Sequence, residues 1–247
     1  MLAENSEGKY TFVHGIGPFS AAVTAQPGFE IVHARFNPLI ALNDGYIRVE
    51  RHLQELRRPP GALCGMELRV PKVFSREAFD EFNRPYIERL KRWGLEVGSA
   101  NPVTRTNVAF EVNPVPEPML AGFYYTMPST MRGETFVLSG APEIASREGG
   151  IQIVARGDTS ADGLRQKLEC ILQVLGAHLA EMKLKWEIAT AVNVYTVFDV
   201  HPLLSALLPV LGAASHCGVT WHFARPPVSG LDLEIDARAV RTELILT

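Results

Sequence analysis

Large apolar residues recur at helical spacing in residues 76–93 of this chain, with polar residues between them. Ser75 is available as an N-cap and Gly94 as a stop, so the spacing predicts one amphipathic helix. Pro85 lies inside the segment. Because its ring removes a backbone donor and crowds the preceding turn, we expect a kink or a break there.

A second amphipathic helix is expected in the other half of the chain. Thr159 or Ser160 is available as its N-cap, and leucine and isoleucine residues from Leu164 to Leu179 form an apolar stripe. The polar residues of this segment fall mostly on the opposite face. The pattern therefore predicts a helix with one side packed against a core.

Short apolar or alternating runs, typical of β-strands, outnumber the helices. They are Ala62–Val70, Thr106–Val112, Leu120–Met127, Thr135–Ser139, Ile188–Val197 and Leu231–Ile235. Residues 113–118 carry three prolines, which cannot fill a central strand, so we predict a hairpin loop there. A second proline loop, residues 224–230, precedes the alternating run 231–236. The alternation places Asp232, Glu234 and Asp236 on an exposed strand face.

Each half of the chain has the same order of elements: strand, helix, strand, helix, strand, proline loop and strand. Such recurrence predicts a diverged duplication. The length of 247 residues also exceeds the usual domain size of roughly 100–150. We therefore predict two tandem α+β domains, residues 1–125 and 130–247, with a turn-rich boundary near Thr126–Arg132.

Composition and charge exclude several classes of protein. Hydrophobic residues make up 47% and charged residues 21%, which matches globular usage and disfavours disordered or fibrous classes. The formal net charge of -3 lacks the basic field that phosphate backbones require, so we do not expect a nucleic-acid partner.

The N-terminal residues and the cysteines both indicate a cytoplasmic protein. The chain starts with acidic residues rather than with a basic segment and an apolar core, so no secretory signal is predicted. The apolar stretch Leu203–Ala214 is shorter than the ~20 residues that cross a bilayer, and no membrane partner is expected. Cys64, Cys170 and Cys217 are far apart and are interpreted as reduced, mostly packing thiols.

Several short motifs, in this order along the chain, resemble the Rid/YjgF family, also called the L-PSP or reactive-intermediate deaminase family. The motifs are Gly17-Pro18-Phe19-Ser20, Phe82-Asn83-x-x-Tyr86, Thr104-Arg105-Thr106-Asn107-Val108, Phe136-Val137-Leu138-Ser139-Gly140, Ala224-Arg225-Pro226-Pro227 and Leu233-Glu234-Ile235-Asp236. The resemblance covers nearly the whole chain. It implies chorismate-mutase-like (YjgF-like) domains, each a mixed sheet backed by two helices, which assemble as homo-oligomers, usually trimers, with sites at domain interfaces.

The resemblance also implies an activity and the residues that carry it. Family members hydrolyse 2-imino or 2-enamino acids to 2-oxo acids and ammonia. The family arginine, which grips the substrate carboxylate, falls on Arg105, and the family glutamate of the last strand falls on Glu234. These two are the expected catalytic residues. The expected substrate-binding residues are Phe19, His33, Arg35, Asn83, Asn107, Ser139 and Gly140.

Neither half of the chain holds the full family set. In the first half the acid position falls near Gly122 and the Ser-Gly pair near His33-Ala34, whereas in the second half the arginine position falls near Gly218. His33 and Arg35 are interpreted as a second cationic element for a dianionic substrate. Phe19 stands where the family often carries a tyrosine, so hydroxyl chemistry is lost at that position.

The leading hypothesis is a hydrolytic deaminase of a small enamine, imine or aminomuconate-like carboxylic acid. Arg105 suits this role because a planar guanidinium donates two parallel hydrogen bonds to a carboxylate. Glu234 would polarise a water molecule if the partner domain brings it near. Two alternatives stay open: a chorismatase-like hydrolase of a cyclic enol-ether acid, and a non-catalytic protein that binds a small acid or a partner.

Other chemistries have little support in the sequence. His201, His216 and His222 lack the spacing of metal ligands, and there is no P-loop, G-x-S-x-G or G-x-G-x-x-G motif, so we expect no metal and no cofactor. Endoribonuclease activity, attributed to some similar proteins, is disfavoured by the acidic charge balance.

Overall fold

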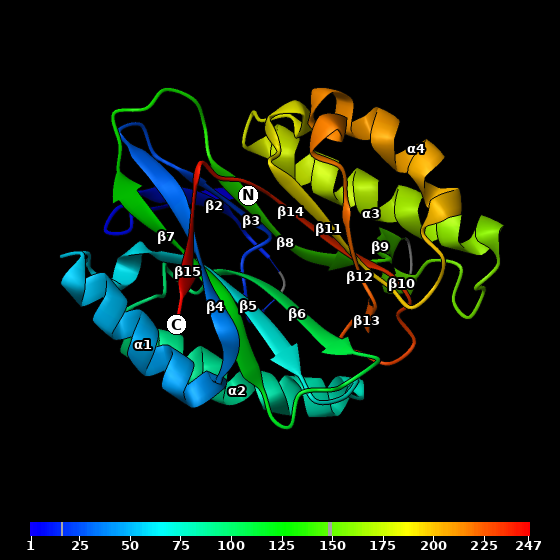
Figure 1. The fold of residues 1–247 in the computed structure, drawn as a ribbon, viewed down its shortest axis with the longest axis horizontal. Helices are drawn as coiled ribbons and strands as arrows, with labels where there is room; N and C mark the ends of the chain where they lie inside the picture. The colour runs from blue at the N-terminus through cyan, green and yellow to red at the C-terminus, as the bar shows by residue number, and fades with distance from the viewer. Residues whose placement is uncertain (16, 148–149) are drawn as a thin grey trace.

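Two β-sheets lie between two pairs of α-helices in the computed structural model, which describes residues 1–15, 17–147 and 150–247 (Figure 1). Helices α1 (Leu42–Glu55) and α2 (Arg76–Arg92) cover one sheet, and helices α3 (Ala161–Glu181) and α4 (His201–Leu211) cover the other. The arrangement confirms the predicted α+β class and the pair of helices behind each sheet.

Sheet A has seven strands in the order β1-β2-β3-β8-β14-β11-β12, and only β11 and β12 are parallel neighbours. Its strands are β1 (Leu2–Asn5), β2 (Tyr10–Val13), β3 (Ala22–Ala25), β8 (Phe136–Pro142), β14 (Glu234–Ala239), β11 (Ala191–Tyr195) and β12 (Thr220–His222). A separate antiparallel pair is formed by β9 (Ile144–Arg147) and β10 (Gly150–Ile153).

Sheet B has six strands in the order β13-β6-β5-β7-β4-β15, and it is mixed because β5 with β6 and β4 with β15 are parallel. Its strands are β13 (Ala224–Arg225), β6 (Thr104–Phe110), β5 (Leu63–Val70), β7 (Met119–Pro128), β4 (Phe29–Ala41) and β15 (Thr242–Leu246). Short 3-10 helices occur at Pro60–Ala62, Trp186–Ile188 and Gly212–Cys217.

Each sheet contains strands from both ends of the chain. Strands β1 to β3 join β8 in sheet A, and the last strand, β15, pairs with β4 in sheet B. The proposed boundaries at residues 125 and 130 stay a prediction. The strand order shows that each sheet contains strands from both sides of that boundary.

Apolar packing holds each helix pair on its sheet. Leu168, Ile171 and Leu175 of α3 lie on one helix face and are buried against Leu138 and Ile235 of sheet A. Tyr46, Val49 and Leu53 of α1 pack in the same way on sheet B. Because burying one such side chain contributes about 1.5–3 kcal/mol, these two cores carry most of the stability of the fold.

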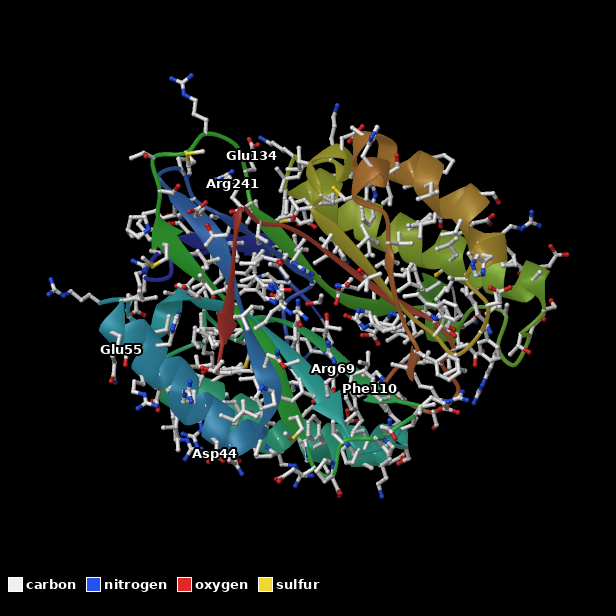
Figure 2. The ribbon with its side chains drawn as sticks, viewed as in Figure 1. Asp44, Glu55, Arg69, Phe110, Glu134 and Arg241 are labelled. Atoms are coloured by element: carbon white, nitrogen blue, oxygen red, sulfur yellow. The ribbon has the colours of Figure 1, made fainter. Side chains whose placement is uncertain are left out.

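A polar layer joins the facing sides of the two sheets. The Thr106 hydroxyl of β6 donates to Asp236 Oδ2 of β14 at 2.6 Å, and Asn193 and Tyr195 of β11 donate to the same carboxylate at 2.7 and 2.9 Å. Arg69 of β5 lies beside this layer, near Phe110 (Figure 2). Since buried polar groups need partners, these bonds fix how the sheets face each other.

Ser139 of β8 connects sheet A to the edge of sheet B. Its hydroxyl donates to the Ser20 carbonyl at 2.6 Å and accepts from the Arg105 backbone N–H at 3.0 Å. Ser20 also forms a parallel bridge with Thr104, the first residue of β6. These contacts therefore hold the first residues of strand β6, including Arg105, against sheet A.

The two predicted helices are confirmed. Helix α2 starts after Ser75, whose hydroxyl accepts from the Ala78 N–H at 3.2 Å, and it continues through Pro85. Helix α3 starts after Ser160, which caps it in the same way. Five of the six predicted strands overlap β5, β6, β7, β8 and β11, with ends that shift by a few residues.

Three details of the sequence prediction were wrong. The 113–118 segment links β6 to β7, but β5 lies between these strands, so the loop is not a hairpin. The predicted strand Leu231–Ile235 begins only at Glu234. Glu234 and Asp236 are 3% and 5% exposed rather than on an open face, because sheet B covers the side of β14 that carries them, where Thr106 bonds Asp236.

Among the described residues, no disulfide joins the three cysteines: Cys64 and Cys170 are buried, and Cys217 is exposed. None of the helices in the described residues is long and apolar enough to span a bilayer.

The Ser139 connection predicts a specific loss of stability. Ser139→Ala removes the donor to Ser20 and leaves the buried Arg105 N–H unpaired, so the free energy of unfolding should fall by about 1–3 kcal/mol. Urea denaturation followed by far-UV circular dichroism measures this change. Ser205→Ala, on the exposed part of α4, is the control and should shift the free energy by less than about 0.5 kcal/mol. Equal effects of the two substitutions would contradict the role of Ser139.

Candidate active site

Arg105 of β6 points toward helix α2 and is only 2% exposed. Its Nη2 donates to Asn83 Oδ1 at 2.7 Å. The guanidinium carbon lies 4.9 Å from the Phe19 ring centroid, 5.5 Å from that of Phe79 and 4.7 Å from that of Tyr86. Three ring faces thus stabilise the cation while they exclude water from it.

Polar atoms around Arg105 are buried but unpaired. Within the described residues, Nε and Nη1 of Arg105, both amide atoms of Asn107 and the Tyr86 hydroxyl have no hydrogen-bond partner. Arg105 and Asn107 are two positions apart on β6, so their side chains share one face of the strand. Unpaired buried donors cost roughly 1–3 kcal/mol each, and this cluster therefore has the properties of a site that a polar ligand completes.

Glu234 approaches this cluster from sheet A. A Cβ placed on Gly140 would lie 2.0 Å from Glu234 Oε1, so any larger residue at this position would have to displace the carboxyl group. Burial raises the pKa of Glu234 well above its ordinary value, and Asp236 and Glu143 raise it further. The charge of Arg105 opposes this shift, but the carboxyl group stays protonated over a wider pH range than in water.

The structure brings together candidate site residues that lie in different halves of the sequence. Arg105 and Asn83 come from sheet B and its helix, whereas Ser139, Gly140 and Glu234 come from sheet A. The Ser139 hydroxyl bonds the Arg105 backbone directly, which joins the two groups. Together these residues form one set that contains an arginine, an acid and a Ser-Gly pair. The roles of these residues toward a substrate stay a prediction.

His33 and Arg35 lie on β4, in different surroundings. His33 is buried against Tyr124 at 4.3 Å between ring centroids, with Glu67 Oε1 at 3.1 Å and Glu243 Oε1 at 3.2 Å. Among the described contacts, none joins His33 to Arg105. Arg35 is exposed. Their predicted part in substrate binding is therefore not supported by any contact with the Arg105 cluster.

The charges near His33 form a network of their own. Burial opposes ionisation of Glu67, but His33, Arg69 and Arg238 outweigh it and hold the pKa of Glu67 well below its ordinary value. Burial raises the pKa of Tyr124, whose hydroxyl donates to Glu67. These paired charges lie between the sheets and fit a structural role, since each has an ionic or hydrogen-bonding partner.

Phe79 and Tyr86 were missed as residues of the site. In the sequence they belong to the apolar residues of the predicted helix 76–93, and such a pattern indicates packing rather than ligand binding. The signal that could have identified them is their position around Asn83: residues 79, 83 and 86 follow helical spacing and share one face of α2. An asparagine in the middle of an apolar stripe marks the face that meets a polar partner.

Comparisons with known proteins identify the family of this chain. A family model described as 2-aminomuconate deaminase CnbZ matches residues 2–244. A 2-amino-5-chloromuconate deaminase from Comamonas testosteroni is 34% identical over 247 residues, covering 98% of this chain and 97% of the relative.

The chain shares its fold with a solved chorismatase structure. A chorismatase crystal structure aligns with a TM-score of 0.55 at 13% identity, covering 89% of this chain and 77% of that one. A member of the YjgF/YER057c/UK114 family from Mycobacterium tuberculosis aligns over 43% of this chain and 79% of its own, with a TM-score of 0.23 and 16% identity. Because its family model spans nearly the whole sequence, this chain belongs to the 2-aminomuconate deaminase CnbZ family.

Proposed function

We propose that the protein is a hydrolytic deaminase of an aminomuconate-like acid, in which Arg105 binds a carboxylate and Glu234 transfers protons. Family membership and the 34% identical deaminase confirm the deaminase prediction. The observation that supports the site is the buried, uncompensated set of donors on Arg105 and Asn107. A carboxylate would supply the missing acceptor and the missing negative charge.

The reaction balances with water as the only co-substrate. An enamine of this kind is protonated on a chain carbon to give the 2-imine, and water then adds to the imine carbon. Proton transfer to nitrogen lets the C–N bond break, so ammonia leaves and a carbonyl group forms. One water is consumed for each ammonia released.

Glu234 has the properties that these proton transfers require. Its raised pKa lets it remain a carboxylic acid at pH values where an ordinary glutamate is ionised, so it can donate the first proton and then, as carboxylate, accept one from the attacking water. Asn107 lies on the face of β6 that carries Arg105 and can orient the substrate amine or carboxylate.

Wider relationships and assembly also belong to the proposal. The order of the motifs supports membership of the broader Rid/YjgF group. A homotrimer and a cytoplasmic location are the corresponding expectations, and sedimentation of the purified protein would test the first.

Arg105→Lys keeps the charge but loses the planar donor group. We expect kcat/KM for 2-aminomuconate to fall about tenfold or more, because each charge-assisted hydrogen bond contributes roughly 1.5–3 kcal/mol. Steady-state kinetics of ammonia release measure the loss. Arg84→Lys on the exposed face of α2 is the matched control and should leave kcat/KM unchanged.

A thermal unfolding curve accompanies the Arg105→Lys measurement. A variant that retains its Tm but loses activity supports a ligand role. A variant that turns over substrate normally, or one that only unfolds, would make Arg105 a structural residue. Wild-type protein that binds the acid without releasing ammonia would indicate a non-catalytic binding protein instead.

Glu234→Gln tests the proton transfer. In the wild type, kcat/KM should fall as pH rises through the raised pKa of Glu234, since only the protonated group donates. The glutamine side chain does not titrate, so the fall of kcat/KM with rising pH should disappear in the variant. Its kcat/KM should also be about 100-fold or more lower. A pH–rate profile between pH 5 and pH 9 tests both, with the surface variant Glu134→Gln as control (Figure 2).

The same substitution has a readout that does not depend on turnover. The native state holds the Glu234 proton more tightly than the unfolded chain does, so the free energy of unfolding should decrease as pH rises above the ordinary value of 4.5. Glu234→Gln should flatten this decrease. An unchanged pH dependence of both rate and stability would refute the assignment.

A further inference from the structure

We propose that the hollow between α1 and α2 holds the second carboxylate of a linear dicarboxylic acid, with Arg89 as its counter-charge. This inference rests on the proposed function and identifies the residue that would bind the far end of its substrate. Arg105 would then bind one end of the molecule and Arg89 the other. The site would select dicarboxylates over monocarboxylates of the same length.

The hollow has a volume of about 260 Å³ and is lined on one side by Tyr46 of α1. Helix α2 supplies Phe82, Tyr86, Arg89 and Arg92. The described lining contains two cations and one acid, the exposed Glu117, so its net charge favours an anion.

Of the two cations in the described lining, Arg89 has a buried hydrogen-bond donor that is not paired. Its Nε is buried and, among the described residues, has no hydrogen-bond partner. Its guanidinium carbon lies 5.2 Å from the Tyr46 ring centroid and 6.0 Å from that of Trp93, so aromatic faces hold it in place. Within the part of the chain that the structure describes, no carboxylate forms an ion pair with it.

Two tyrosines connect this hollow to Arg105. The Tyr86 ring lines the hollow and also lies 4.7 Å from the Arg105 guanidinium. Burial raises the pKa of Tyr46 to about 12, while the charges of Arg105 and Arg89 oppose that shift, so both cations act on one hydroxyl. The unpaired Tyr86 hydroxyl lies in the same region.

Helix geometry gives the axial separation of the two α2 residues that mark the ends of the proposed site. Asn83, which holds Arg105, and Arg89 are six residues apart on α2, which corresponds to roughly 9 Å along the helix axis. A short unsaturated chain with a carboxylate at each end fits such a span, and the ring faces of Tyr46 and Tyr86 offer it an apolar wall.

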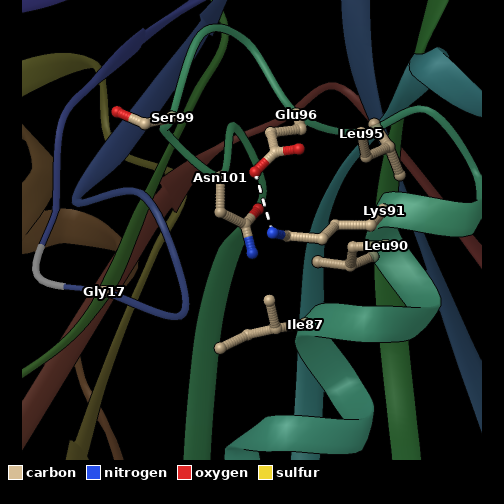
Figure 3. A pocket seen from close by; sticks show the side chains of 8 residues that line it. All are labelled: Gly17, Ile87, Leu90, Lys91, Leu95, Glu96, Ser99 and Asn101. Carbon is tan, nitrogen blue, oxygen red and sulfur yellow. Dashed lines mark ion pairs between the residues drawn. The ribbon is translucent and has the colours of Figure 1, made fainter.

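A second hollow near α2 shows that the presence of a cation does not by itself make an anion-binding site. It has a volume of about 110 Å³, and its only described cation, Lys91, pairs with Glu96 at 3.2 Å (Figure 3). That charge is already neutralised. Arg89 differs because its buried donor has no such partner.

The test compares two stable six-carbon ligands, muconate and hexa-2,4-dienoate, which differ by one carboxylate. Isothermal titration calorimetry should show wild-type protein binding muconate about tenfold or more tightly than hexa-2,4-dienoate, since one charge-assisted contact corresponds to that factor. Arg89→Gln should weaken muconate about tenfold and leave hexa-2,4-dienoate unchanged. Arg84→Gln, an exposed residue of the same helix, should change neither affinity.

The outcomes separate this inference from the proposed function. Equal affinity of the wild type for both ligands, or equal loss for both in Arg89→Gln, would overturn the dicarboxylate subsite. If Arg105→Lys weakens both ligands and Arg89→Gln weakens neither, Arg105 keeps its role and only the subsite fails. If Arg89→Gln does not fold, Arg89→Lys retains the charge and should reduce the muconate preference without affecting hexa-2,4-dienoate.

Discussion

The hydroxyl of Ser139 bonds two strands that belong to different sheets, and the geometry of the site depends on that connection. It fixes the Arg105 backbone beside the Ser20 carbonyl. The side chain of Arg105 then points toward helix α2, where it bonds Asn83. The next residue along β8, Gly140, has no side chain and gives Glu234 its place. A shift of β8 against β6 would separate Glu234 from Arg105.

Burial has opposite consequences for the two charged groups that the site brings together. Aromatic rings surround the guanidinium of Arg105, and an arginine stays charged even when it is dehydrated. Glu234 has acidic neighbours as well as a dry environment, so its neutral form is favoured. An anion-binding cation and a proton-donating acid therefore coexist in one buried region without neutralising each other completely.

The sequence predicted the helices because these depend on local patterns. Ser75, Ser160 and the apolar stripes define α2 and α3, and Asn83 and Arg105 stand in short motifs. Glu234 was placed on an exposed face because alternation along one strand does not reveal that neighbours cover both faces. The composite set across two sheets depends on strand pairs such as β8 with β3, and residues like Ser139 and Ser20 are 119 positions apart. No local pattern encodes such pairing.

The exchange of strands between the sheets also sets an order of events during synthesis. Strand β4 needs β15 as its outer neighbour, and their paired residues His33 and Glu243 are 210 positions apart. While the ribosome makes the intervening chain, one edge of β4 has no partner, and unpaired edges invite association with other chains. The structure thus implies that this edge of β4 stays unpaired until β15 has been synthesised, and pairing over such a sequence separation slows folding.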